Sequence, residues 1–229
     1  MVTLQEVPGL VVRPLDGPAD LAEALALNAR VYADRGIVDS VDDDYLADRW
    51  IDVSTYFGAF HEGAMVGTAR LIPYHPDVHI FQMFEIDTEW TERLAGAPLQ
   101  GNAFEVSALS VPKDAPGGFF AVSGALYRGM LQYSLVQRRF LWFAILTPML
   151  ARILNKVLGV PLQIIGPRVD VMGAVRMPSI IDLVTFLDHI RTHHPEQYAY
   201  AMRGLEIDLT AMPEPIFDTT ADVSFGPRR

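Results

Sequence analysis

The sequence predicts an α+β fold built on one mixed β-sheet, and the order of its strand and helix patterns is the main evidence. The segment 55–73 reads as a β-hairpin, because two β-prone arms, 55–60 and 65–73, flank the turn HEGA. Two further β-prone runs, 104–111 and 139–146, follow and are separated by a long helical pattern. A hairpin followed by β-α-β units is typical of helices packed on a mixed sheet.

The other elements follow in chain order. Residues 10–14 form a short first strand, and Asp20 is the expected N-cap of a helix that ends near Val31. The Asp-rich stretch 33–50 reads as a loop or a short helix, and Gly63 suits a turn position with positive φ. Helices are also expected at 87–95, 119–138, 148–159 and from Asp182 to Met202, with a break near Pro195.

The C-terminal third is expected to complete the sheet. Residues 161–166 read as a short strand, whereas 175–183 contains Pro178 and is expected to be an edge strand at best. Because no repeat or linker divides the chain, one domain is expected over 1–211. The tail 212–229 is rich in proline and lacks a pattern, so it is expected to be loosely ordered.

Composition excludes several classes of site and partner. The chain has 229 residues, half of them hydrophobic, and no cysteine, so disulfides, thiolate zinc sites and cysteine nucleophiles are excluded. The net charge is −10, yet residues 105–176 carry 8 basic and 3 acidic side chains. This basic region suits an acidic protein partner or a phosphorylated co-substrate. Nucleic acid binding is not expected, because the whole chain is acidic and lacks a binding motif.

Targeting, membrane and metal signals are also missing from the sequence. The N-terminus lacks the basic and apolar regions of a signal peptide, and the apolar run 140–146 is too short to span a bilayer. A soluble cytoplasmic protein is therefore expected. His189 and His193 have the i, i+4 spacing of metal ligands, but nothing nearby completes a site, and no metal is expected.

Two charged residues interrupt apolar strands and are candidates for chemistry. Arg70 lies between Ala69 and Leu71, and Glu105 lies between Phe104 and Val106. Such a charge either faces solvent or is buried with a partner, and the alternation of side chains leaves both interpretations open. A carboxylate that lines a pocket could take a proton from an attacking amine.

An ordered set of segments resembles the acyl-homoserine-lactone synthases and the long-chain N-acyl amino acid synthases, two branches of the GNAT superfamily. The resemblance runs from about Leu27 to Gly173 and comprises ARVY (29–32), Asp48, Asp52, VGTARLIP (66–73), Phe84 and FEVSALSV (104–111). It implies a GNAT-like fold with a V-shaped split between two strands. It also implies transfer of a fatty acyl group from a thioester to an amine.

The resemblance implies a role for each matching residue. Glu105 matches the general base of the family. The residues implied to shape the amine pocket are Arg30, Asp48, Asp52, Arg70, Phe84 and Ser107. Those implied to line the acyl channel are Trp142 and Ala144, and those implied to bind the oxyanion or the donor through backbone N–H groups are Leu109, Val111, Gly117 and Gly118.

The implied co-substrate is an acyl-acyl carrier protein or an acyl-CoA, with a small amine as acceptor and no permanently bound cofactor. An acidic carrier protein would be attracted to the basic region. The expected docking residues are Arg128, Arg138, Arg139, Arg152 and Lys156, the last two sharing a helix face at i, i+4.

Departures from the family pattern shape the choice of function. Ala108 stands where the family has an arginine, and Trp50 falls between the two aspartates instead of before them. Both departures weaken the resemblance to the lactone synthases more than the resemblance to acyltransferases in general, and Ala108 favours transfer to an amino acid or another amine. The loop 111–118 lacks the usual CoA-binding pattern. A CoA-dependent acyltransferase, a catalytically silent lipid- or effector-binding protein, and an unrelated α+β domain remain as alternatives.

Overall fold

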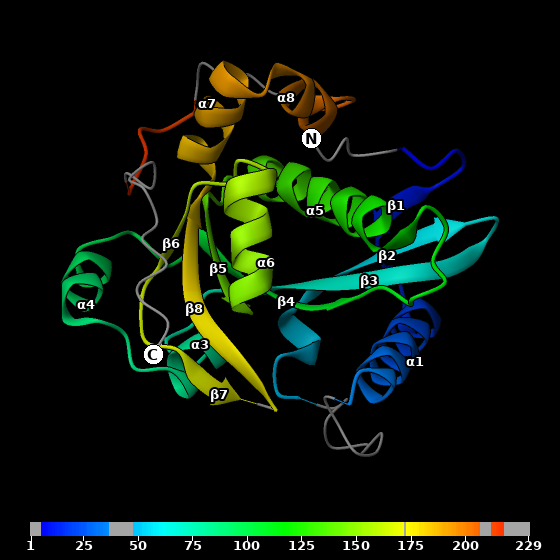
Figure 1. Cartoon of the computed structure of the whole chain (residues 1–229), viewed down its shortest axis with the longest axis horizontal. Helices are drawn as coiled ribbons and strands as arrows, with labels where there is room; N and C mark the ends of the chain where they lie inside the picture. Colours follow the sequence, from blue (N-terminus) through cyan, green and yellow to red (C-terminus); the bar gives the residue numbers. More distant parts are fainter. Residues whose placement is uncertain (1–5, 37–47, 172, 207–211, 218–229) are drawn as a thin grey trace.

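An eight-stranded mixed sheet forms the centre of the molecule (Figure 1). The structure, a computed structural model, describes residues 6–36, 48–171, 173–206 and 212–217. The strands run in the order β1-β2-β3-β4-β5-β8-β6, and β7 pairs with β8. They are β1 (Val11–Pro14), β2 (Thr55–His61), β3 (Ala64–Pro73), β4 (Ala103–Ser110), β5 (Leu141–Leu146), β6 (Leu162–Ile164), β7 (Val169–Val171) and β8 (Ala174–Asp182). Only β4 and β5 pair in parallel among these strands.

Helices cover both faces of the sheet (Figure 1). One face packs against α5 (Gly118–Val136), α6 (Pro148–Arg152), α7 (Leu183–His193) and α8 (Pro195–Met202). The other face packs against α1 (Pro18–Asp34), α3 (His79–Met83) and α4 (Thr88–Ala95). Helix α5 lies directly on β3, because Gly67 has no side chain and a Cβ there would come within 2.7 Å of Val122. No helix in the described ranges combines the length and hydropathy that a bilayer crossing needs.

The predicted V-shaped split lies between β4 and β5. Their pairing runs from Ala103 opposite Leu141 to Val106 opposite Ala144, and beyond this point the two strands continue without pairing. A β-bulge in β4 begins at the same place, since Ser107 lies opposite Arg70 and Ser110 opposite Thr68. Ala108 in the bulge has a φ of 52°, which is uncommon for a residue other than glycine. Because a bulged strand bends, it contributes to the opening beside β5.

The predicted hairpin is confirmed, with positive φ at Gly63, but the start of the first helix is corrected. Helix α1 begins at Pro18 and its N-cap is Gly17. Proline suits the first turn of a helix, because its missing N–H would have no partner there. Asp20 lies inside that turn and pairs with Arg13 at 2.7 Å instead of capping the helix. The aspartates 42–44 fall outside the described residues.

The predictions for the C-terminal strands are corrected more strongly. Strand β8 lies between β5 and β6 instead of at an edge of the sheet. It tolerates Pro178 because the pairing with β6 ends at Ser179, and the Pro178 carbonyl still accepts a hydrogen bond from the Ile165 N–H. The expected helix 148–159 is divided, since α6 ends at Arg152 and a π-helical turn follows over Ile153–Val157.

The first part of the tail is bound to the body of the protein, contrary to expectation. The buried carboxylate of Asp182 accepts hydrogen bonds from the N–H groups of Val184 and Thr185, which cap α7. Its second oxygen accepts from the N–H groups of Ile216 and Phe217 at 2.8 and 3.0 Å. The Phe217 ring is buried against Trp90 of α4. One carboxylate therefore fixes both the start of α7 and residues 212–217.

Replacing Asp182 by alanine should destabilise the fold, because four backbone N–H groups lose a charged acceptor. We expect a loss of about 3 kcal/mol in the free energy of unfolding, measured by urea titration. Asp188→Ala, at an exposed position of the same helix, is the control and should change it by less than about 0.5 kcal/mol. Equal midpoints for the two variants would contradict this role of Asp182.

Candidate functional site

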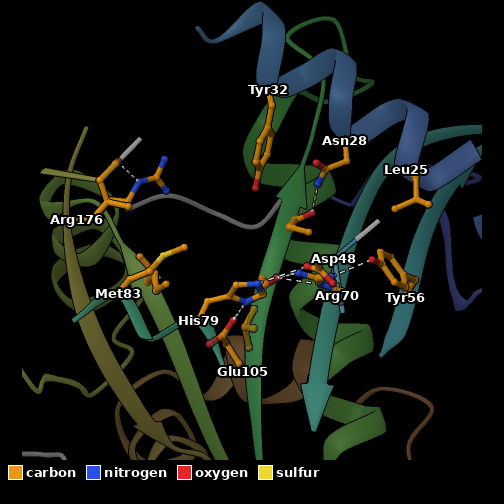
Figure 2. A pocket seen from close by; sticks show the side chains of 15 residues that line it. Leu25, Asn28, Tyr32, Asp48, Tyr56, Arg70, His79, Met83, Glu105 and Arg176 are labelled. Atoms are coloured by element: carbon orange, nitrogen blue, oxygen red, sulfur yellow. Dashed lines mark hydrogen bonds and ion pairs between the residues drawn. The ribbon is translucent and has the colours of Figure 1, made fainter. Parts of the chain in front are cut away.

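A cavity of about 350 Å³ opens beside the split, on the face of the sheet that α1 covers. Figure 2 shows side chains from α1, the strands and α3 converging on it. The residues that line it are Leu25, Asn28, Tyr32, Asp48, Tyr56, Arg70, His79, Met83, Glu105, Val106, Ser107, Ala108, Ile145, Val171 and Arg176.

Strand register explains why the charged residues meet on this face. Residues directly opposite each other in neighbouring strands point to the same side of a sheet. Tyr56 lies opposite Arg70, and Arg70 lies opposite Ser107. Glu105 is two residues before Ser107 and therefore shares its face. The sheet thus carries Tyr56, Arg70, Ser107 and Glu105 side by side.

Arg70 is buried, with 6% of its surface exposed, and its guanidinium is surrounded by acceptors. Nε and Nη2 donate to Ser107 Oγ at 3.1 and 2.9 Å, and Nη1 donates to the Tyr56 hydroxyl at 3.1 Å. Nη1 also lies 2.7 Å from Asp48 Oδ2. Burial would raise the pKa of Asp48, but hydrogen bonding to His79 and the charge of Arg70 outweigh it and lower this pKa to about 2.

Glu105 is 1% exposed and both of its oxygens are engaged. Oε1 lies 2.7 Å from His79 Nδ1, and Oε2 accepts from the Ile80 N–H at 2.9 Å. His79 Nε2 lies 3.4 Å from Asp48 on its other side. Burial would lower the pKa of His79, but the two carboxylates outweigh it and raise this pKa to about 9. At neutral pH an imidazolium therefore lies between Asp48 and Glu105.

These interactions form one continuous network with balanced charge. It runs from Ser107 through Arg70, Asp48 and His79 to Glu105 (Figure 2). Two cations and two carboxylates alternate along it, so the network is neutral when all four are ionised. Buried charges are tolerated when they are paired in this way.

A second, apolar cavity of about 110 Å³ lies on the opposite face of the sheet. Its wall includes Trp142 of β5, whose Nε1 donates to Ser134 Oγ at 2.9 Å and is therefore satisfied inside the core. The lining is otherwise mostly aliphatic and aromatic and includes Leu131, Leu154, Leu158, Ile181, Phe186 and Tyr127. Burial of Tyr127 raises the pKa of its hydroxyl to about 12.

The structure brings four of the predicted amine-pocket and catalytic residues together, namely Asp48, Arg70, Glu105 and Ser107. It does not bring Arg30 to the cavity. On α1 the helical period directs Leu25, Asn28 and Tyr32 toward the cavity and leaves Arg30 exposed. Asp52 is exposed in a short 3₁₀ turn, Ile51–Val53. Phe84 is buried in the cluster beneath α3 and α4 instead of forming a cavity wall.

The residues predicted to bind the acyl chain and the donor are more dispersed. Ala144 lies at the vertex of the split, opposite Val106, and Trp142 lines only the second cavity. Val111 is fully buried, and its carbonyl accepts a hydrogen bond from Arg35. Leu109, Gly117 and Gly118 lie outside the lining of both cavities. Gly117 and Gly118 both have positive φ where α5 begins.

Arg128 and Arg139, two of the predicted docking residues, contact aromatic and acidic side chains of the protein. Arg128 lies 3.8 Å from Glu6 and over the Tyr200 ring, and Arg139 lies over the Phe104 ring. Arg138, Arg152 and Lys156 are exposed. The expected shared α-helical face of Arg152 and Lys156 is corrected, because the π-helical turn begins between them.

Sequence reasoning missed several lining residues, above all His79. It lies in a stretch that has no strong period, and only the fold brings it to Glu105. Asn28 and Tyr32 carried a usable signal, since they share a helical face with Leu25. Asn28 donates to the carbonyl of Ala108 at 3.2 Å and so ties α1 to the bulge. No group of three or more His, Asp or Glu side chains suited to a metal occurs within the described ranges.

Solved structures resemble the chain in fold. The N-acyl amino acid synthase FeeM, from uncultured soil microbes, matches at 16% identity over 80% of this chain and 96% of its own, with a TM-score of 0.61. The acyl-homoserine-lactone synthase LasI matches at 18% identity over 87% and 97%, with a TM-score of 0.63. The chain has the GNAT-like fold of these synthases.

A third GNAT-like match is the CoA-dependent acyl-homoserine-lactone synthase BjaI. It aligns at 17% identity over 80% of this chain and 81% of its own, with a TM-score of 0.59. No protein-family model matches the sequence, and no curated protein matches it. At these identities the comparisons establish the GNAT-like fold alone.

The raised pKa of His79 can be measured directly. We expect one histidine to titrate near pH 9 in proton NMR, with His79→Gln identifying its signal. Glu105→Gln should lower this pKa by roughly one unit or more, because it removes a carboxylate that stabilises the imidazolium. The exposed Glu92→Gln is the control and should leave it unchanged. An ordinary pKa near 6.5 for His79 in the unmodified protein would contradict the network.

Proposed function

We propose that the protein is an N-acyltransferase that moves a medium- or long-chain fatty acyl group from an acyl thioester to an amine such as an amino acid. The observation that carries this proposal is the pair of buried Glu105 and partly exposed His79, which faces a cavity at the split of a GNAT-like sheet. A polar cavity on one face and an apolar cavity on the other suit an amine and a fatty chain respectively.

Proton transfer is assigned to the pair instead of to Glu105 alone. Glu105 is almost fully buried, whereas the His79 side chain is 22% exposed and lines the cavity. The neutral form of His79, which is the minor form at neutral pH because its pKa is about 9, would take the proton of the attacking amine at Nε2. The Glu105 carboxylate would stabilise the imidazolium that forms. Glu105 then resembles the buried aspartate that orients histidine in the Ser-His-Asp triad.

The proposed acyl transfer needs no reactant other than the thioester and the amine. The amine nitrogen forms a bond to the thioester carbonyl carbon, and the C–S bond breaks to release a thiolate. The proton accepted by His79 is then delivered to this thiolate. Ala108 in the β4 bulge lines the cavity, and the backbone N–H groups of the residues that follow it, Leu109 to Val111, are the proposed stabilisers of the oxyanion.

The split offers a path for the acyl chain. A thioester carbonyl beside His79 would place its chain in the split just beyond the last strand pair, Val106 and Ala144, and direct it toward Trp142 on the other face. The apolar cavity there favours a hydrocarbon, because each buried methylene contributes about 0.8 kcal/mol. The donor is an acyl carrier protein or acyl-CoA; Arg138, Arg152 and Lys156 are the exposed basic residues that would meet an acidic carrier.

One observation favours a second candidate, a catalytically silent lipid-binding protein. Both Glu105 oxygens already accept hydrogen bonds, and Asp48 lies near His79 Nε2. A network satisfied in this way could be purely structural. In that case the fatty ligand would bind without turnover. Acyl-homoserine-lactone synthesis is the remaining enzymatic alternative.

An assay for amide formation decides between these functions. The purified protein is incubated with acyl-carrier protein or acyl-CoA and a panel of amines, and the products are identified by mass spectrometry. We expect an N-acyl product, and Glu105→Gln should fold normally but lose about 10²- to 10⁴-fold in rate. Glu92→Gln is the matched control at an exposed site. A retained fatty ligand with no amide from any donor would support the silent binder and overturn the acyltransferase.

A further inference from the structure

Arg176 is a cation of the first cavity that lies outside the charge network. It belongs to β8 and lies opposite Val169 of β7. Its Nε donates to the carbonyl of Val171 at 3.1 Å, which fixes the direction of the side chain. Figure 2 shows the guanidinium turned toward the cavity. Within the described part of the chain, no carboxylate lies at ion-pair distance from Arg176.

Arg176 gives the described lining of the first cavity an excess positive charge. The opposite wall is neutral, because Arg70 and His79 balance Asp48 and Glu105. Arginine stays protonated, so the described side chains that line the cavity sum to a charge of +1. Met83, Ile145 and Val171 contribute apolar groups to the lining of the same cavity, where an ionic interaction is weakened less than in water. The cavity therefore favours an anionic group at this end.

The shape of the guanidinium and the size of the cavity indicate which anion fits. With Nε held by Val171, the terminal nitrogens are directed to a planar acceptor such as a carboxylate. A donor phosphate is a poorer fit, because the long pantetheine arm separates it from the thioester that must reach His79. An amino acid carries its carboxylate next to its amine, so one small molecule can contact both walls of a cavity of about 350 Å³.

We propose that Arg176 binds the α-carboxylate of the acceptor and thereby selects an amino acid over an uncharged amine. This assignment rests on the proposed acyl transfer. The acceptor lies with its carboxylate on β8 and its amine toward His79. Arg176 then acts as a specificity residue on the wall opposite the proton-transfer pair.

The first test compares an amino acid with its methyl ester as acceptor. For the unmodified protein, kcat/KM should favour leucine over leucine methyl ester, and Arg176→Gln should reduce this preference by about 10- to 100-fold, chiefly through KM. Leucine and leucine methyl ester differ in the pKa of their amines. This difference cancels when the unmodified protein and Arg176→Gln are compared at the same pH. Arg176→Lys should restore part of the preference, because it keeps the charge but loses the planar fork.

Arg168→Gln is the matched control, since Arg168 is exposed just before β7 and outside the cavity lining. An unchanged preference in Arg176→Gln, or an equal loss in Arg168→Gln, would overturn the assignment. So would a rise in KM confined to donors that carry a phosphate, measured by comparing acyl-pantetheine with acyl-phosphopantetheine.

The second test needs no turnover and separates this inference from the proposed function. Binding of N-dodecanoyl-leucine and of its methyl ester is measured by calorimetry in the same variants. A carboxylate preference that depends on Arg176, without amide synthesis, would support the site and overturn only the acyl transfer. Amide synthesis with equal binding of acid and ester would overturn only the role of Arg176.

Discussion

The buried guanidinium of Arg70 is the interaction on which the rest of the site depends. A charge in the middle of a sheet is tolerated only if every side of it is compensated, and the compensation comes from three places. Tyr56 on β2 and Ser107 on β4 contribute hydroxyl groups, and Asp48 contributes a carboxylate. Asp48, which compensates the charge of Arg70, also contacts His79. Asp48 and Glu105 therefore hold the His79 ring from its two sides. The network thus joins neighbouring strands to the segment before β2 and to α3.

The backbone around this network leaves the split between β4 and β5 open next to Glu105. Glu105 lies one residue before the last parallel pair of β4 and β5, so its side chain is fixed by regular strand geometry, while the residues after it diverge from β5. Ala108 adopts a conformation uncommon for its type, and Asn28 holds its carbonyl from α1. Strained backbone of this kind persists where the surrounding contacts over-determine it. The opening and the rigid carboxylate are therefore built from consecutive residues of one strand.

Local signals allowed much of the fold to be predicted, and long-range contacts account for most of the rest. The hairpin at Gly63, helix α5 and the start of α7 next to Asp182 follow from short-range rules, and the structure has each of them. Pro178 predicted an edge strand, and this prediction is wrong. Strand β8 can lie between β5 and β6 because its pairing with β6 ends at Ser179, one residue before the proline is reached. The site divides in the same way. Arg70 and Glu105 stand out as charges in apolar strands, whereas His79 and Arg176 lie in segments whose positions only the tertiary fold determines.

We propose that an amide is formed at the split, with the amine side on one face of the sheet and the fatty chain on the other. A crystal structure of the protein with a bound N-acyl amino acid tests it most directly. We expect the amide group beside His79, the carboxylate at Arg176, and the hydrocarbon passing Ala144 toward Trp142. An acyl chain that lies elsewhere, with the first cavity free of the head group, would contradict it.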